Sequence, residues 1–119
     1  MDDEALTVSS EKLDNALVVH IVGEVDLDTV DLMDTALAEA AATVTAPEIV
    51  VADLTDVTFF DSMGISSLLT ARQRCQEHRV SLVVVASDRR VLRPIKLTDL
   101  DRVFTVVGAV EEAVRSDVA

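Results

Sequence analysis

The chain begins with two runs rich in apolar and β-branched residues, separated by a polar segment. Residues 6–10 alternate imperfectly, and residues 16–22 form an almost unbroken β-branched run. Asp14 and Asn15 lie between them and suit a tight turn, so the pattern predicts an N-terminal hairpin. The apolar spacing then becomes helical, which predicts a helix that is capped by Asp28 or Thr29 and ends near Thr43.

From Pro47 onwards, predicted strands and helices alternate. Apolar runs predict strands at 49–54, 80–86 and 103–107, with residues 57–60 carrying the chain from the first of these to a helix over 62–78. The buried face of that helix is expected to hold Ile65, Leu68, Leu69 and Cys75. A short helix begins at Asp88, where Pro94 is expected to kink it or end it early, and a last helix follows Gly108.

This order of elements predicts an α/β fold. Strands that are apolar throughout are typical of a sheet covered on both faces, and alternation with helices favours parallel pairing. We therefore expect a mainly parallel sheet of four to five strands, with an antiparallel N-terminal edge strand and about four helices. No linker or repeat divides the chain, so residues 1–119 are expected to form a single domain.

The charge balance narrows the classes of partner. The chain has 22 acidic and 10 basic residues and a formal net charge of −12, which repels nucleic-acid phosphates and anionic lipid headgroups. No apolar run approaches the roughly 20 residues that a membrane-spanning helix needs. The sequence starts Met-Asp-Asp-Glu, unlike an export signal. We expect no nucleic-acid partner, no membrane insertion and a cytoplasmic location.

The sequence lacks the motifs of common enzymes and cofactor sites. Its three glycines are far apart, which excludes a phosphate-binding glycine-rich loop. Ser62 and Gly64 match only half of the Gly-x-Ser-x-Gly pattern of serine hydrolases. His20 lies in a predicted strand and His78 at the far end of the helix from Ser62, so both are interpreted as structural.

Metal binding is not indicated either. Cys75 has no second cysteine to pair with, and the acidic residues between Glu24 and Asp34 lack the central glycine and terminal glutamate of a calcium loop. We therefore expect no enzymatic activity, no cofactor and no metal.

One segment stands out, Asp61-Ser62-Met63-Gly64, where a buried strand ends and a helix begins. Asp61 or Ser62 could simply cap the helix, which stabilises a fold by about 1 kcal/mol. However, Gly64 lies in the first helical turn, where glycine costs up to about 1 kcal/mol relative to alanine. That cost is explained if another backbone comes close, and Met63 would offer a pliable apolar contact beside it. A bulky residue at position 64 is therefore expected to hinder docking more than folding.

With the upstream Gly-Glu-Val-Asp (residues 23–26) and the order of elements, this segment resembles the anti-sigma factor antagonists, small single-domain members of the STAS family. The resemblance also includes residues 100–104 and 110–113. Two departures are Met63, where a small residue is common, and Thr98-Asp99-Leu100, where many members have glycine before leucine.

The resemblance implies a switchable protein-binding module. The antagonist binds an anti-sigma factor that is itself a serine kinase, which frees a sigma factor. Phosphorylation of the matching serine, here Ser62, ends the complex, and a PP2C-type phosphatase reverses it. Asp26, Asp61, Ser62, Met63 and Gly64 are the expected partner-binding residues. Thr58, Ser66 and Ser67 are less favoured phosphoacceptors because they lie within a strand or a helix.

An alternative remains open on the sequence alone. The chain could be a constitutive STAS-like scaffold in a stress-sensing assembly or beside a transporter, with Ser62 as an unmodified cap. A monomer is expected in either case, because no predicted helix has a second apolar stripe.

Overall fold

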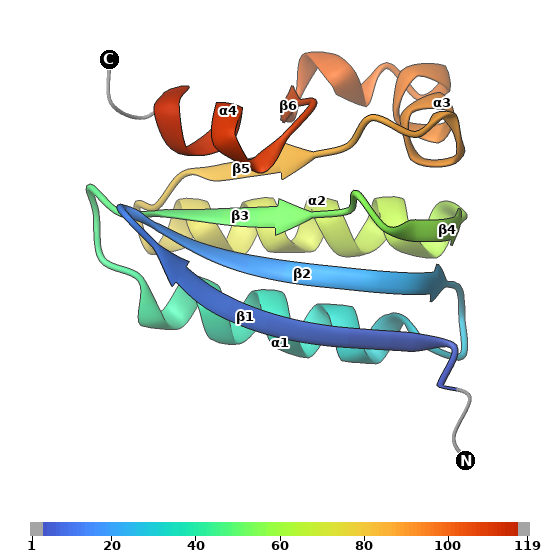
Figure 1. Cartoon of the computed structure of the whole chain (residues 1–119), viewed down its shortest axis with the longest axis horizontal. Helices are drawn as coiled ribbons and strands as arrows, with labels where there is room; N and C mark the ends of the chain where they lie inside the picture. Colours follow the sequence, from blue (N-terminus) through green and yellow to red (C-terminus); the bar gives the residue numbers. More distant parts are fainter. Residues whose placement is uncertain (1–3, 117–119) are drawn as a thin grey trace.

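Six strands form one mixed sheet in the computed structural model, which describes residues 4–116 (Figure 1). The strands are β1 (Leu6–Leu13), β2 (Ala16–Val25), β3 (Ile49–Asp53), β4 (Val57–Phe60), β5 (Leu82–Val85) and β6 (Thr105–Val107). The helices are α1 (Val30–Thr43), α2 (Ser62–Glu77), α3 (Arg89–Leu97) and α4 (Val110–Ser116), with a 3-10 turn, η1 (Leu100–Arg102).

The strand order is β1-β2-β3-β5-β6, with β4 also paired to β2. Among the strands of residues 4–116, only the β1–β2 pair is antiparallel, which confirms the predicted mainly parallel sheet with an antiparallel edge strand. The count is six because residues 57–60 form a separate strand. The ten-residue β2 is longer than the five-residue β3, so β4 pairs with the end of β2 that β3 does not reach.

Gly23 makes this change of partner possible. The register of β2 with β4 shifts between Gly23 and Glu24, and Gly23 has a φ of +115°, a conformation that residues with a side chain rarely adopt. A Cβ at this position would lie 2.1 Å from the carbonyl oxygen of Ala5. The glycine of the Gly-Glu-Val-Asp segment is therefore required by the backbone of the sheet.

Helices cover both faces of the sheet unequally. Buried side chains of α1, α2 and α3 join the larger core cluster on one face, and α4 packs over a smaller cluster from β2, β3 and β5 on the other. Figure 1 shows α1 and α2 running behind the sheet. Leu69 was predicted to lie in the core, but it is 40% exposed. In α2 the buried stripe passes through Ile65, Leu68 and Cys75 and leaves Leu69 outside it.

Pro94 was expected to kink α3 or to end it early, and the second alternative was wrong, because the helix continues past Pro94 to Leu97. Val91 and Ile95, one helical turn apart, are both fully buried, and their packing holds the helix through the proline. The helix closes at Thr98, whose amide donates to the carbonyl of Pro94 at 3.3 Å.

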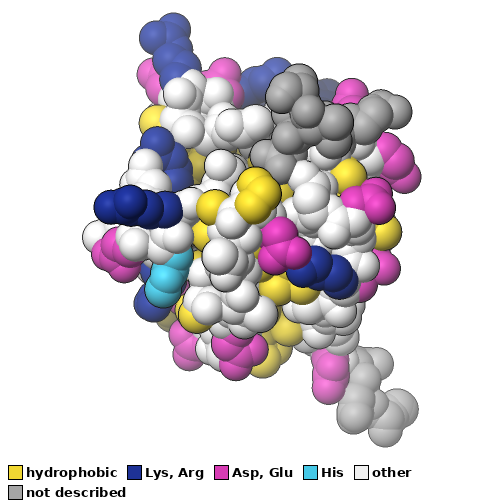
Figure 2. Space-filling view, turned by 90° about the vertical axis from the view of Figure 1, so that its left-hand side faces the viewer, with side chains coloured by type: hydrophobic (Ala, Val, Ile, Leu, Met, Phe, Trp, Pro, Cys, Tyr) yellow, Lys and Arg dark blue, Asp and Glu magenta, His cyan; other side chains and the backbone are white. Residues whose placement is uncertain are grey.

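Figure 2 shows the end of the molecule opposite to β4 and the start of α2. Acidic and basic side chains are mixed on this face, with small groups of apolar side chains between them. Mixed charge of this kind is typical of a solvated surface.

Candidate functional site

The ends of β2 and β4 lie side by side. Val25 pairs with Phe60 in register, so the residues that follow them, Asp26 and Asp61, leave the sheet at the same edge. The carboxyl ends of parallel strands are where ligands and partners commonly bind in α/β folds. The two acidic residues singled out in the sequence are therefore brought together by strand pairing.

Asp61 caps α2. Its side chain Oδ1 accepts a hydrogen bond from the amide of Met63 at 2.9 Å, and its carbonyl oxygen accepts from the amide of Gly64 at 3.0 Å. This is the usual way in which a helix satisfies its first free amides. Of the two predicted caps, the structure uses Asp61 and leaves the Ser62 side chain available.

Ser62 is the first residue of α2, and it is exposed. Within residues 4–114 its hydroxyl makes no hydrogen bond. Ser67 is buried and donates a hydrogen bond to Asp34 of α1, whereas Ser66 and Thr58 are exposed. Among these hydroxyls, Ser62 combines exposure with a position at a helix N-terminus, where amides and the helix dipole favour an anion.

Gly64 has an explanation within the chain. It is buried, and a Cβ there would lie 2.3 Å from Cε1 of the Phe60 ring. The group that comes close is thus an aromatic side chain of β4, and not the backbone that was expected. A leucine at position 64 would displace this ring, so loss of stability must be expected together with any loss of docking.

Met63 is half-buried and packs against the larger core cluster, so it is less exposed than the sequence suggested. Two apolar side chains that the sequence analysis did not single out are more exposed at this edge. Leu27, next to Asp26, is 72% exposed, and Phe59, two residues before Asp61, is 48% exposed. Both could have been suspected from the sequence, because they lie within two residues of Asp26 and Asp61.

Asp26 organises the loop between β2 and α1. Its Oδ1 accepts hydrogen bonds from the amides of Asp28 at 2.9 Å and Thr29 at 3.2 Å. The Thr29 hydroxyl donates to the carbonyl of Glu24 at 2.7 Å instead of capping α1. Thr29 is the N-cap residue of α1, as one of the two predictions had it, but its side chain makes no capping hydrogen bond. Oδ1 of Asp26 instead binds the amides of the loop that leads into the helix.

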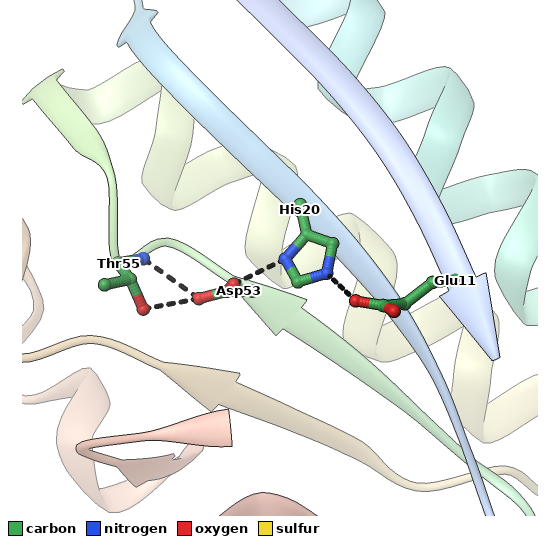
Figure 3. Close-up of polar contacts among 4 residues, drawn as sticks. All are labelled: Glu11, His20, Asp53 and Thr55. Carbon is green, nitrogen blue, oxygen red and sulfur yellow. Dashed lines mark hydrogen bonds and ion pairs between the residues drawn. The ribbon is translucent and has the colours of Figure 1, made fainter. Parts of the chain in front are cut away.

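A second polar cluster crosses three strands (Figure 3). Nδ1 of His20 in β2 lies 2.6 Å from Oδ2 of Asp53 in β3, and Nε2 lies 2.7 Å from Oε1 of Glu11 in β1. Asp53 is only 8% exposed, and its Oδ1 accepts from the amide of Thr55 at 3.1 Å. His20 was expected to be structural, but its two partners were not predicted, although Asp53 is a lone acidic residue in an apolar strand and could have indicated one of them.

The carboxylates set the protonation of His20. Partial burial of the imidazole lowers its pKa, but hydrogen bonds and charge from Glu11 and Asp53 outweigh this, so the pKa of His20 is raised above 6.5. Both ring nitrogens face carboxylates. This arrangement occupies His20 in an ion cluster and leaves it no nitrogen to serve as a base for Ser62.

The remaining chemistry-bearing groups do not form a site. Burial raises the pKa of the Cys75 thiol to about 11, which makes it a poor nucleophile. In the part of the chain that the structure describes, no group of three or more His, Cys, Asp or Glu side chains could hold a metal ion. No helix between residues 4 and 116 is long and apolar enough to cross a membrane.

Comparison with known proteins agrees with this fold. The model of the STAS domain matches residues 7–113, so the chain belongs to the STAS domain family. It is 30% identical over 110 residues to the anti-sigma-F factor antagonist RsfB of Mycobacterium tuberculosis, covering 92% of this chain and 88% of RsfB. It is 29% identical over 109 residues to RsfA of the same organism, also an anti-sigma-F factor antagonist, covering 92% of this chain and 85% of RsfA.

A solved structure extends the comparison to three dimensions. The crystal structure of an anti-sigma factor antagonist from Mycobacterium paratuberculosis superposes with a TM-score of 0.88 at 27% identity, covering 99% of this chain and 98% of that one. The resemblance seen in the Asp61–Gly64 segment and in the order of elements is thereby confirmed.

Proposed function

We propose that this chain is an anti-sigma factor antagonist that binds a serine-kinase anti-sigma factor and is released when Ser62 is phosphorylated. The observation that carries the proposal is the exposed Ser62 hydroxyl at the start of α2, without a hydrogen-bond partner among residues 4–114. The relatives RsfA and RsfB are named for antagonism of an anti-sigma factor, which supports the choice of partner.

The docking surface proposed for the unphosphorylated protein is the edge formed by the ends of β2 and β4. Asp26 and Asp61 each use Oδ1 within their own loops, and Oδ2 of each has no hydrogen-bond partner in the described part of the chain. These oxygens suit cationic groups of a partner. Exposed Leu27 and Phe59 would add apolar contact, and Met63 and Gly64 would contribute through the shape of the first turn of α2.

Phosphorylation would act on the complex rather than on the fold. A phosphoserine carries about −1.5 to −2 charges, which the amides and dipole of a helix N-terminus accept. The same charge would appear beside Asp26 and Asp61, where a partner surface must be desolvated. Burying a dianion that has no cationic partner of its own in the interface costs several kcal/mol, so the complex would dissociate while the domain stays folded. A PP2C-type phosphatase in the cytoplasm would restore binding.

The test has two parts. Protein purified from its native cells is digested and its phosphate mapped by mass spectrometry, with Ser62→Ala as the comparison. Binding to the anti-sigma factor that copurifies with the protein is then measured for wild type and Ser62→Asp. We expect phosphate on Ser62 and a loss of affinity of about tenfold or more in Ser62→Asp.

Ser66→Asp is the matched control, because it adds the same charge at an exposed position one turn further along α2. It should bind within about twofold of wild type. Equal weakening by both variants would show a general charge effect and contradict a specific switch. Absence of phosphate on Ser62 under every growth condition would favour the constitutive STAS scaffold, with Ser62 as an unmodified residue of the first turn.

A further inference from the structure

Helix α3 concentrates positive charge in an acidic chain. It holds four of the ten basic residues, namely Arg89, Arg90, Arg93 and Lys96, and no acidic residue. In the whole chain acidic residues outnumber basic residues by 22 to 10, so a helix with four basic residues and no acidic residue is unusual for this protein. This segment therefore differs in charge from the rest of the molecule.

The helix is amphipathic, with a sharp division between its faces. Val91 and Ile95 are fully buried in the core. On the other side, a shallow hollow of about 350 Å³ is lined by Arg89, Leu92, Arg93, Lys96 and Leu97, which we call the α3 surface. Leu97 is 73% exposed, so the cations of the α3 surface surround an apolar side chain that is open to solvent.

The cations of the α3 surface have no partners among residues 4–114. Arg90, which is outside this surface, donates to Asp88 at 2.8 Å and to the carbonyl of Thr58 at 3.3 Å. In contrast, Arg89, Arg93 and Lys96 form no ion pair or side-chain hydrogen bond with residues 4–114. On a solvated helix face, basic residues are often stabilised by ion pairs with acidic residues three or four positions away, and α3 contains no acidic residue.

A second hollow extends the α3 surface towards the edge of the sheet. It measures about 300 Å³, shares Leu92 and Lys96 with the first, and reaches Val107 and Gly108 beside β6. Asp101 lines this second hollow together with Lys96, whereas the charged residues that line the first hollow are all basic. An occupant that crosses both would need its acidic groups over Arg89, Arg93 and Lys96.

We propose that the α3 surface is a docking site for an acidic segment of a partner protein, one that places carboxylates on Arg89, Arg93 and Lys96 and an apolar side chain against Leu92 and Leu97. Charge complementarity selects the carboxylates, because three cations without partners attract them before contact. The exposed leucine provides the apolar centre that a cationic rim encloses.

A protein segment fits better than a membrane or a nucleic acid. Both of these are extended polyanions, and they would also meet the rest of a chain with a net charge of −12. A single acidic segment meets only the α3 surface. The site does not depend on Ser62, so the proposal stands independently of the proposed switch.

The probe is a synthetic helical peptide that presents glutamate and leucine side chains along one face, titrated into isotope-labelled protein and followed by NMR. We expect saturable amide shifts confined to Arg89–Leu97 and the neighbouring hollow, and weaker binding at high salt. The double variant Arg93→Glu/Lys96→Glu should lose about tenfold or more in affinity. Leu97→Ser should lose a smaller, salt-independent part.

Matched controls separate this site from general electrostatics. Arg74→Glu/Arg79→Glu makes the same change of net charge outside α3 and should bind within about twofold of wild type. A peptide with glutamine for glutamate should not bind. Absence of saturable shifts, equal loss in both double variants, or preferential binding of phosphatidylserine vesicles or a single-stranded oligonucleotide would overturn the proposal.

Discussion

At the scale of single residues, backbone conformation separates positions that require glycine from positions that tolerate its absence. Gly23 has a positive φ and the carbonyl of Ala5 where a Cβ would be, and Gly64 has the ring of Phe60 there. Asp99 is the reverse case, because it adopts the left-handed conformation, with φ of +59°, without being glycine. By its resemblance to the family, the chain has Asp99 at a position where many members have glycine before leucine.

Asp99→Gly should therefore stabilise the protein. Left-handed backbone costs an L-residue roughly 1–2 kcal/mol, less for aspartate, and the greater freedom of glycine in the unfolded chain offsets part of the gain. We expect an increase of about 0.5 kcal/mol in the free energy of unfolding, measured by urea denaturation. Asp99→Ala removes the same carboxylate without relieving the backbone and should give no increase. A gain in both variants would assign the effect to charge.

At the scale of elements, the cluster of Glu11, His20 and Asp53 ties β1, β2 and β3 together. His20 and Asp53 are direct partners in the parallel register, and Glu11 lies two residues beyond Ser9, the antiparallel partner of His20. The cluster is on the part of the sheet face that α4 leaves open, since α4 packs over β3, β5 and β6. The ion pairs of this cluster form only when the His20 imidazole is protonated.

This cluster predicts a pH dependence of stability. The pKa of His20 in the folded protein is raised above 6.5, so its contribution is fully present below the unfolded pKa and is lost as the pH rises through the folded pKa. We expect the stability advantage of wild type over His20→Gln to shrink as the pH rises above the unfolded value of about 6.5. Urea denaturation at several pH values measures this advantage.

His78→Gln is the control, since it removes the other histidine outside this cluster. Because the cluster around His20 is intact in this variant, its stability should still decrease as the pH rises through the folded pKa of His20. A wild-type advantage over His20→Gln that stays constant from acidic to alkaline pH would show that folding does not raise the pKa of His20.

At the scale of the whole molecule, one sheet serves two cores. The larger cluster lies between the sheet and α1, α2 and α3, and the smaller lies under α4. Alternate residues of the same strands point into each, as Val50 and Val51 of β3 do. Because neither core can lose its strands without exposing the other, residues 1–119 are proposed to fold as a single domain.

A single cooperative unfolding transition should follow. The chain has no tryptophan or tyrosine, so circular dichroism is paired with methyl NMR signals of Val50 and Val51, which report one core each. All three curves should share one urea midpoint. Earlier loss of the Val51 signal would show that the α4 side unfolds separately and would contradict a single cooperative unit.

The sequence was sufficient where a structural property depends on neighbouring residues. It predicted the hairpin turn at Asp14-Asn15, the helical segments and a cap by Asp61 or Ser62, because these follow from local periodicity and local hydrogen bonds. It also placed Asp61 and Ser62 at a junction of strand and helix, which is enough to identify a candidate site.

Tertiary structure decided the properties that depend on partners far apart in the chain. Separate pairing of β4 with β2, the ion cluster around His20, and the contact of Gly64 with Phe60 all require a register or an approach between elements. The exposure of the α3 surface also depends on which face of that helix the core buries. Local patterns give each element its preferences, but long-range packing determines which side chains meet and which remain without a partner.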